Sequence, residues 1–494
     1  MKRNILKYTA IILSLIIIIA AFAGCSAGSA SDDSGSATNN SEKSAQVEVN
    51  AANADYFTER DLDFSYADRE TQTIVLNGSS AESTSSAVKT DGSVITITDE
   101  GVYIVSGKLT DGGIIVDAEE TDKIQIVLNG AEISNSDGAA IYAESADKLF
   151  ITLAEGTENS LSDGGKEYTQ TDSEKTVDGV IFADCDLTLN GAGKLTVNAG
   201  WKHAVVSKND LVITGGEYDI TSAEKGFEGE NSIRICGGGF TVKSGDDAFH
   251  ADEETDKEKG FVYIQGGDFK IESGDDGIHG VTTLTIDGGS FDITAHEALE
   301  ATVITINGGE INISASDDGI NAAAKSEFYD PQVIINAGSL TIKMGAGDTD
   351  AIDSNGTIEI NGGTVDITAQ SAFDYETSGK INGGEVTVNG EKVTEITNQF
   401  GGGMGGMRGG LGGFGNREQM TDENGETLTR PERENFTDEN GETVTGRGRK
   451  NFGGNGGTPP EMPTDENGNA VFPGNMKPDG EMPGNVTGDP SQTA

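Results

Sequence analysis

Apolar and polar side chains alternate along much of this chain, in short runs that are interrupted by paired glycines. Residues 291–294 (Phe-Asp-Ile-Thr) and 311–314 (Ile-Asn-Ile-Ser) show the alternation of a half-buried β-strand. The glycine pairs recur about 20 to 30 residues apart. They are Gly215-Gly216, Gly237-Gly238, Gly266-Gly267, Gly288-Gly289, Gly308-Gly309, Gly362-Gly363 and Gly383-Gly384, with Ala337-Gly338 in the same register. Strand, tight turn and strand at this period predict a solenoid.

Each repeat has room for three short strands, as in residues 283–286, 290–294 and 298–301. One repeat cannot bury its apolar face alone, so successive repeats stack. We therefore predict an all-β protein, a parallel β-helix of about ten turns. At the ~4.8 Å spacing of hydrogen-bonded strands, such a stack is about 50 Å long.

Asparagine often stands directly before the glycine pair, and stacking brings these side chains together. Amides one strand spacing apart can hydrogen-bond along the stack, and asparagine tolerates the left-handed bend expected there. We interpret this column as structural. Its members are Asn190, Asn307, Asn336, Asn361 and Asn382.

Composition divides the chain into five parts. Residues 1–24 combine Lys2 and Arg3 with an apolar run and end before Cys25, which predicts an export signal with lipidation of that cysteine. A transmembrane anchor is the alternative, although the run is shorter than the ~20 residues a span needs. Residues 25–54 predict a flexible tether, 55–122 an N-terminal β cap, 123–398 the parallel β-helix, and 399–494 a disordered Gly- and Pro-rich tail with acidic repeats.

These parts predict a location outside the cell. We expect a monomer at the extracellular face of the cell membrane, in contact with the membrane through the lipid only. The formal charge of −50 argues against nucleic-acid binding, which requires a basic surface. Cys185 and Cys236 do not form a disulfide framework, and we expect two separate thiols.

Acidic residues recur at fixed offsets after the second strand of each repeat. A first column holds Asp247, Asp276, Glu297, Asp318 and Asp350. A second, three residues on, holds Glu228, His250, His279, Glu300, Asn321, Asp353 and Asp374. A third, just before the first, holds Asp246, Asp275, His296 and Asp317.

Stacked carboxylates repel one another, and nearby lysines are too few to neutralise them, so a hard divalent cation is expected. Ca²⁺ takes six to eight oxygen ligands from carboxylates, amides and backbone carbonyls. The candidate ligands are Asp246, Asp247, Asp275, Asp276, Glu297, Glu300, Asp317, Asp318, Asn321, Asp350 and Asp353. In the alternative interpretation these are solvated turn carboxylates. We do not favour a Zn²⁺ site on His250, His279 and His296, because they fall in different columns without a Cys or HExxH pattern.

The repeat resembles a known family of exported carbohydrate-binding domains. The resemblance covers residues 60 to 395 and rests on motifs such as Ser-Gly-Asp-Asp-Gly-Ile-His-Gly at 273–280 and Leu-Thr-Asp-Gly-Gly-Ile-Ile-Val-Asp-Ala at 109–118. It implies a right-handed parallel β-helix like that of pectate lyases, bound Ca²⁺, and binding of plant cell-wall polysaccharides, including cellulose and polygalacturonate. The ligand positions that it carries over are Asp246, Asp247, Asp275, Asp276, Asp317 and Asp318.

We therefore expect a surface lipoprotein that binds acidic polysaccharide through Ca²⁺, without catalysis. A Ca²⁺-dependent polysaccharide lyase and a structural adhesin are the alternatives. A lyase needs a base near the metal, which is an arginine in the lyases that the repeat resembles, and Arg234 is the only arginine between Glu70 and Gln399. Lys202, Lys225 and Lys325 are the alternative bases, although no spacing favours them. If the Ca²⁺ ions are fully enclosed, sugar rings would instead contact aromatic side chains, and core or loop packing is the alternative role of these side chains. The candidates are Trp201, Tyr263, Phe328, Tyr329 and Tyr375. The insertions at 251–260 and 322–331 are expected to border one surface.

Overall fold

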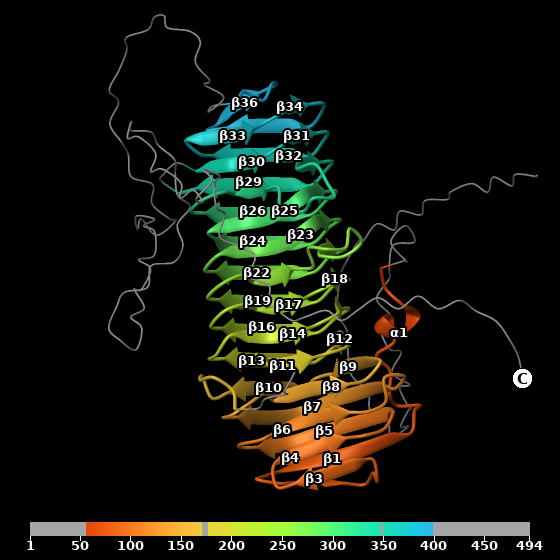
Figure 1. The fold of residues 1–494 in the computed structure, drawn as a ribbon. Coiled ribbons are helices and arrows are strands. Elements are labelled where there is room, and N and C mark those ends of the chain that lie inside the picture. Colours follow the sequence, from red (N-terminus) through yellow and green to blue (C-terminus); the bar gives the residue numbers. More distant parts are fainter. Residues whose placement is uncertain (1–55, 170–175, 346–348, 399–494) are drawn as a thin grey trace, which may run out of the picture. The chain divides into compact units, whose positions relative to one another are not determined.

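The computed structural model describes residues 56–169, 176–345 and 349–398. The predicted signal (1–24), the tether (25–54), Cys25 and the tail (399–494) lie outside the described residues. Within them, strands stack turn upon turn into three parallel ladders (Figure 1). No helix in this part of the chain is long and apolar enough to cross a membrane.

Ladder A contains the strands that follow the glycine turns. It consists of β10 (Glu158–Asp163), β13 (Lys194–Ala199), β16 (Glu217–Ser222), β19 (Gly239–Ser244), β22 (Asp268–Ser273), β24 (Ser290–Ala295), β26 (Glu310–Ala315), β29 (Ser339–Met344), β32 (Thr364–Thr368) and β35 (Glu385–Val388). Its side chains alternate between exposed and buried, as they do along the whole of β24. This is the alternation that the sequence predicted.

Ladder B contains the next strand of each turn. It consists of β8 (Ile141–Ser145), β11 (Gly179–Ala183), β14 (His203–Ser207), β17 (Phe227–Gly229), β20 (Phe249–Ala251), the first parts of β23 (Asp276–Ile286) and β25 (Glu297–Ile306), β27 (Ile320–Ala322), β30 (Asp350–Ser354) and β33 (Ser371–Tyr375).

Ladder C completes the turn. It consists of β9 (Lys148–Leu153), β12 (Asp186–Gly191), β15 (Asp210–Ile213), β18 (Ser232–Ile235), β21 (Phe261–Ile264), the second parts of β23 and β25, β28 (Gln332–Ile335), β31 (Thr357–Ile360) and β34 (Ser378–Ile381).

The first residues of the stack combine parallel and antiparallel pairing. They form α1 (Glu59–Leu62), β1 (Thr71–Gly78), β2 (Ala81–Ser83), β3 (Val88–Asp91), β4 (Val94–Ile97), β5 (Gly101–Leu109), β6 (Gly113–Asp117) and β7 (Lys123–Asn135). β1 and β5 pair in parallel, whereas β1–β2 and β3–β4 are antiparallel. At the other end, β36 (Glu391–Val393) pairs antiparallel with β35. Parallel turns therefore begin within the segment for which a cap was predicted.

The core is one continuous column of aliphatic and aromatic side chains. Tyr218, Phe240, Phe269 and Phe291 stack along ladder A, with successive ring centroids 5.3, 4.7 and 4.5 Å apart. Equivalent residues of successive turns therefore lie above one another, which confirms the all-β parallel solenoid. The count of about ten turns and the right-handed sense stay predictions.

The glycine turns place backbone against backbone. Gly289 has a φ of +110°, and a Cβ there would lie 2.9 Å from the carbonyl oxygen of Gly267. Beside this turn the amide ladder runs as predicted: Asn336 donates to Asn307 at 2.8 Å, and Asn361 donates to Asn336 at 2.9 Å. Asn190 does not join it, because it is buried and accepts from Thr152 instead.

An N-terminal strap that the sequence did not predict, residues 56–63, packs against the outer face of ladder C. Asp61 is buried there and pairs with Lys148 at 2.8 Å, and it also accepts a hydrogen bond from Thr188 at 2.7 Å. Tyr56 stacks on Tyr263 with ring centroids 4.0 Å apart. The strap therefore covers one side of the stack and leaves ladder B as a separate face.

Candidate metal centre

The outer face of ladder B carries the second predicted column in register. Direct pairing joins Glu228 to His250, His250 to His279 and His279 to Glu300, and continues through Asn321 and Asp353 to Asp374. We use the name acidic column for this series together with the first predicted column, which holds Asp247, Asp276, Glu297, Asp318 and Asp350. Parallel pairing without offset makes the sequence spacing a direct measure of which side chains are neighbours.

The first predicted column lies beside the second, at the entry to each strand of ladder B. Asp276 pairs with Glu297, and the Asp276 amide donates to Oδ1 of Asp247 at 2.9 Å. In the same way, the Asp350 amide donates to Oδ1 of Asp318 at 3.1 Å. Asp247 and Asp318 thus each use one carboxylate oxygen to bind the backbone of the next turn, and the other oxygen can face a neighbouring side chain or an ion.

The third column is more exposed. The amide of His296 donates to the Asp275 carbonyl at 2.9 Å, and the amide of Asp317 donates to the His296 carbonyl at 2.9 Å. Asp275 is exposed, whereas Asp246 is half-buried. Burial, with the charges of Asp247 and Asp275, raises the pKa of Asp246 to about 6.

Lysines neutralise the N-terminal end of the acidic column. Glu228 is buried and lies 3.1 Å from the ammonium of Lys225 and 3.3 Å from that of Lys208. Burial opposes ionisation, but Lys225 and then His203 outweigh it and hold the pKa of Glu228 at about 2. This carboxylate needs no further cation.

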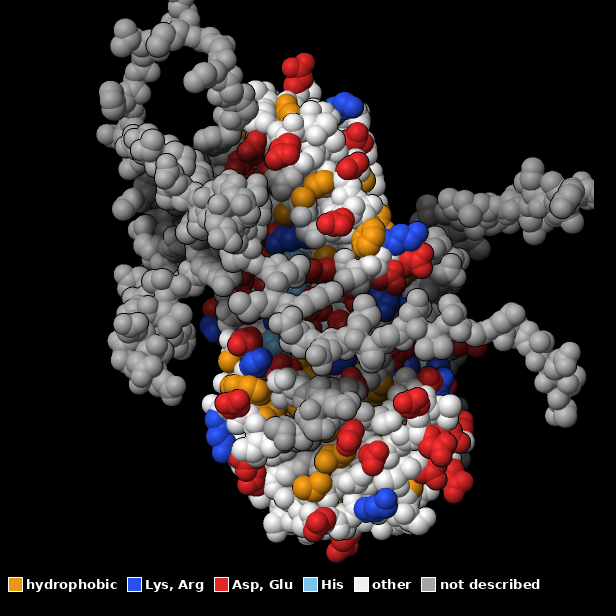
Figure 2. Space-filling model, in the orientation of Figure 1, with side chains coloured by type: hydrophobic (Ala, Val, Ile, Leu, Met, Phe, Trp, Pro, Cys, Tyr) orange, Lys and Arg blue, Asp and Glu red, His pale blue; other side chains and the backbone are white. Residues whose placement is uncertain are grey.

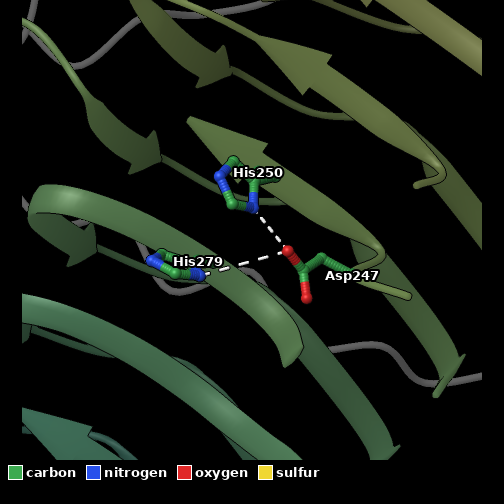
Figure 3. Close-up of side chains that lie close together, drawn as sticks. All are labelled: Asp247, His250 and His279. Atoms are coloured by element: carbon green, nitrogen blue, oxygen red, sulfur yellow. Dashed lines mark hydrogen bonds and ion pairs between the residues drawn. The ribbon is translucent and has the colours of Figure 1, made fainter. Parts of the chain in front are cut away.

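Two histidines occupy the middle of the column. Nδ1 of His279 lies 2.8 Å from Asp276, 3.3 Å from Glu300 and 4.0 Å from Asp247. Nδ1 of His250 hydrogen-bonds the same Asp247 oxygen. Figure 3 shows the Asp247 carboxylate facing both rings. Burial, and then the charge of His250, lowers the pKa of His279 to about 4, so this imidazole is neutral at pH 7.

Two carboxylates in this region contact each other directly. Asp276 and Glu300 are only 5% and 4% exposed and share a hydrogen bond. Burial, followed by the charges of Asp247 and Glu297, raises the pKa of Asp276 well above its usual value. The ammonium of Lys325 lies 2.9 Å from Glu300 and compensates one of these charges. Without a cation, one carboxylate therefore has to keep its proton.

The C-terminal half of the column has oxygen donors and little compensation. Asn321 donates to Glu297 at 2.8 Å and to Glu300 at 3.2 Å. Burial and the charge of Glu300 raise the pKa of Glu297 to about 7. Burial is also the main cause that raises the pKa of Asp318 to about 8 and that of Asp353 to about 6.

Several sets of these side chains converge within reach of one ion. Potential ligand atoms lie within 4.8 Å of one another in four groups: Asp247, His250 and His279; Asp276, His279 and Glu300; His296, Glu297 and Asp317; and Asp246, Asp247 and Asp275. Three of the four include a histidine. The ligand set predicted from the sequence omitted these histidines, although the repeated Asp-x-x-His spacing at 247–250 and 276–279 could have identified His250 and His279.

The donor chemistry divides the column in two. From Glu297 onward the predicted ligands offer oxygen only, which fits Ca²⁺: they are Glu297, Glu300, Asp317, Asp318, Asn321, Asp350 and Asp353. Asp247 and Asp276 are held by imidazoles, so their surroundings suit Ca²⁺ less well. Figure 2 shows acidic, histidine and lysine side chains gathered at mid-height of the stack.

The two predicted insertions meet beside this face. The Tyr329 hydroxyl donates to the Lys257 carbonyl at 2.8 Å, which joins one insertion to the other. Phe328 and Tyr329 are 45% and 38% exposed. Tyr263, in contrast, is buried under the strap, and Trp201 packs on Tyr168 at 4.5 Å. Phe328 and Tyr329 are therefore the aromatic candidates that offer the most ring surface.

The known proteins that this chain resembles have names that refer to carbohydrates. A carbohydrate-binding domain-containing protein of Acetivibrio thermocellus is 36% identical over 126 residues, which cover 26% of this chain and 44% of that protein. The chain thus matches less than half of that relative's length. The solved structure of a polysaccharide lyase-like protein from C. thermocellum, a gadolinium derivative, covers 67% of this chain and 98% of its own, at 24% identity and a TM-score of 0.39.

At that TM-score the likeness adds nothing to the fold assignment, which rests on the strand pairing. The family comparison covers more of the chain. One family model, described as carbohydrate-binding domain-containing protein, matches residues 91–346 and 300–427, more than half of the sequence. The chain therefore belongs to the family of carbohydrate-binding domain-containing proteins.

Proposed function

We propose that this protein binds polysaccharide on the outer face of ladder B, and that Ca²⁺ held by the C-terminal half of the acidic column takes part in binding. The observation that carries the proposal is the stack of half-buried and buried carboxylates from Glu297 to Asp353, with Lys325 as the ammonium in contact with it. Family membership supports carbohydrate as the ligand class.

Repulsion between the stacked carboxylates favours a bound cation. Two carboxylates ~4.8 Å apart repel by about 3 kcal/mol at an effective dielectric constant near 20. The raised pKa values of Glu297, Asp318 and Asp353 express this repulsion together with burial. A divalent ion would replace the protons that these carboxyl groups otherwise retain. Its open coordination positions would accept oxygen atoms from outside the protein.

An acidic glycan fits this chemistry best. A protein of charge −50 repels a polyanion unless a cation lies between them. Ca²⁺ would bridge protein carboxylates to the uronate carboxylates of a polysaccharide such as polygalacturonate. The exposed rings of Phe328 and Tyr329 offer apolar surface for sugar rings, by which a neutral glycan such as cellulose would bind.

We propose binding without catalysis. Arg234 pairs with Asp210 and donates to the Tyr56 carbonyl at 3.2 Å, so it belongs to the face covered by the strap. It is therefore not placed as a base beside the acidic column. A lyase would release unsaturated products from polygalacturonate, which absorb in the ultraviolet, and we expect no such release.

Attachment to the cell surface through a lipid on Cys25 is the second part of the proposal. Its support is the sequence of the first 25 residues. Mass spectrometry of the protein purified from membranes should find a lipid on Cys25, and Cys25→Ser should move the protein into the soluble fraction. A Cys25→Ser variant that stays in the membrane would contradict lipid anchoring.

The deciding experiment is thermal unfolding of the full chain with Ca²⁺ or EDTA, repeated with polygalacturonate and with cellulose fragments. We expect Ca²⁺ to raise the midpoint and polygalacturonate to raise it further only when Ca²⁺ is present, because a ligand of the folded state stabilises it by mass action. Cellulose fragments that act equally in EDTA would instead indicate recognition through the aromatic rings.

A matched pair of variants locates the effect. Glu297→Gln removes a carboxylate of the acidic column, whereas Glu310→Gln removes an exposed one from ladder A. The Ca²⁺-dependent rise should shrink in the first and stay in the second. No response of the parent protein to Ca²⁺ would contradict the Ca²⁺ site, and carbohydrate binding would then rest on family membership.

A further inference from the structure

A cavity of about 320 Å³ lies on ladder C beside the strap. Asp210 of β15, Arg234 of β18 and Phe261 of β21 line it from three successive turns, and the insertion at 251–260 supplies further lining residues. The volume lies within the range of small-molecule sites, which is about 300–1,000 Å³. The cavity is separate from the acidic column, which lies on ladder B.

The β-helix does not need the insertion that borders this cavity. In two later turns, β23 and β25 run without a break from ladder B to ladder C, whereas residues 252–260 separate β20 from β21. Hydrogen bonds hold the insertion in place: the Gly260 amide donates to the Asn231 carbonyl at 2.6 Å, and the Lys257 carbonyl accepts from Tyr329 at 2.8 Å. A cavity bordered in this way is preformed, which lowers the entropic cost of binding a ligand.

The lining leaves hydrogen-bonding groups available to a ligand. Lys259 forms no ion pair with the described residues, and within the same part of the chain the side-chain oxygen of Asn231 accepts no hydrogen bond. Asp256 accepts from the Glu258 amide with one carboxylate oxygen, at 3.0 Å, which leaves its second oxygen for a ligand. Phe261 adds a half-buried aromatic ring. The cavity therefore combines a donor, acceptors and a ring.

The charges of the lining select the class of ligand. Arg234 is paired with Asp210, so the remaining charges are Lys259 against Asp256 and Glu258. Carboxylates are therefore in excess, and in a protein of charge −50 such a cavity does not favour an anion. A neutral pyranose fits better, because its hydroxyl groups both donate and accept hydrogen bonds and its C–H face can pack on an aromatic ring.

We propose that this cavity is a second carbohydrate site, which binds a neutral sugar unit of a polysaccharide without Ca²⁺. The Lys259 ammonium donates to sugar hydroxyls, Asn231 and Asp256 accept from them, and the Phe261 ring packs on the apolar face of the sugar. The proposal depends on carbohydrate as the ligand class of the proposed function, which family membership supports. It depends neither on Ca²⁺ nor on the acidic column.

The test is saturation-transfer NMR of the full chain in EDTA, with cellobiose, mannobiose and galactobiose as neutral probes. At least one of them should bind, and digalacturonate should bind about tenfold more weakly than that sugar, or less. Lys259→Gln should weaken binding of the neutral sugar about tenfold, because it removes a charged donor. Phe261→Leu should weaken it about threefold, because it removes the ring and keeps an apolar side chain. Lys257→Gln is the matched control, since Lys257 is an exposed lysine of the same insertion outside the lining.

A second background separates this site from the exposed rings beside the acidic column. In a Phe328→Leu protein, Lys259→Gln should weaken sugar binding by the same factor as in the parent, with an unchanged unfolding midpoint in the absence of sugar. The proposal is overturned if none of the three sugars binds, if digalacturonate binds more tightly than they do in EDTA, or if Lys259→Gln and Phe261→Leu leave binding unchanged. The Ca²⁺ response can fail without affecting this result, because every measurement is made in EDTA.

Discussion

At the scale of single residues, the same side chain takes opposite roles according to its neighbours. Glu228 and Glu297 both lie on the outer face of ladder B, yet their pKa values are about 2 and about 7. Lys225 and Lys208 contact the first, whereas Glu300 is the charged neighbour that contributes most to the second. Where lysine is lacking, the column has to take up protons or metal ions.

The raised pKa values predict how stability depends on pH in a Ca²⁺-free protein. Glu297 and Asp318 have folded pKa values of about 7 and 8, above their usual values of 4.5 and 3.8. The folded state therefore binds more protons, and stability present at pH 4 is lost as pH rises to 8. Each pKa unit by which the folded and unfolded states differ changes the free energy of unfolding by at most about 1.4 kcal/mol per group.

Denaturant unfolding in EDTA across pH 4 to 8 measures this slope. Ca²⁺ binds the ionised carboxylates, so its stabilising effect should grow over the same range. Glu297→Gln should flatten the slope, because amides do not titrate. Stability in EDTA that rises from pH 5 to 8 would contradict the raised pKa values.

At the scale of elements, ladder spacing converts sequence repeats into rows of contacts. The amide ladder is the simplest case, since Asn336 both donates to Asn307 and accepts from Asn361. Its members are exposed, so their hydrogen bonds compete with water. The ladder therefore contributes modestly per turn and repeats over several turns.

Asn336→Ala should destabilise the protein by about 1–2 kcal/mol, because it removes two side-chain hydrogen bonds of about 0.5–1.5 kcal/mol each. Urea unfolding measures the change. Asn312→Ala is the control, since Asn312 is an exposed asparagine of ladder A outside the amide ladder. Equal losses in the two variants would show that the amide ladder adds nothing.

At the scale of the whole described fold, the strap links the start of the chain to turns far along the sequence. Asp61 pairs with Lys148 and accepts from Thr188, and both members of the ion pair are buried. Thr214 donates to the Asp61 carbonyl at 2.8 Å. The strap therefore stabilises several turns of ladder C at once.

Asp61→Ala should cost about 3–5 kcal/mol, because it leaves the Lys148 ammonium buried without its partner. Asp63→Ala is the control, since the Asp63–Arg69 pair is open to solvent on both sides and solvated pairs contribute about 0–1 kcal/mol. Guanidinium unfolding compares the two. A second change, Lys148→Met, should restore part of the loss. An Asp61→Ala protein as stable as the Asp63→Ala protein would mean that the strap is not held by this pair.

Sequence by itself determined the features that the repeat generates. Strand alternation, the turns at paired glycines, the amide ladder from Asn307 onward and the alignment of Glu300, Asn321 and Asp353 all depend on spacing, and parallel pairing turns spacing directly into contact. Candidate ligands could be named for the same reason, although their role as metal ligands stays a prediction.

Only the tertiary structure decided the features that depend on contacts between turns without a common period. The strap over ladder C, the burial of Asn190 beneath it and the lysines that neutralise Glu228 come from side chains outside the repeat. The orientation of His250 and His279 is of the same kind, because a column position fixes which residues are neighbours but not which ring nitrogen faces a carboxylate.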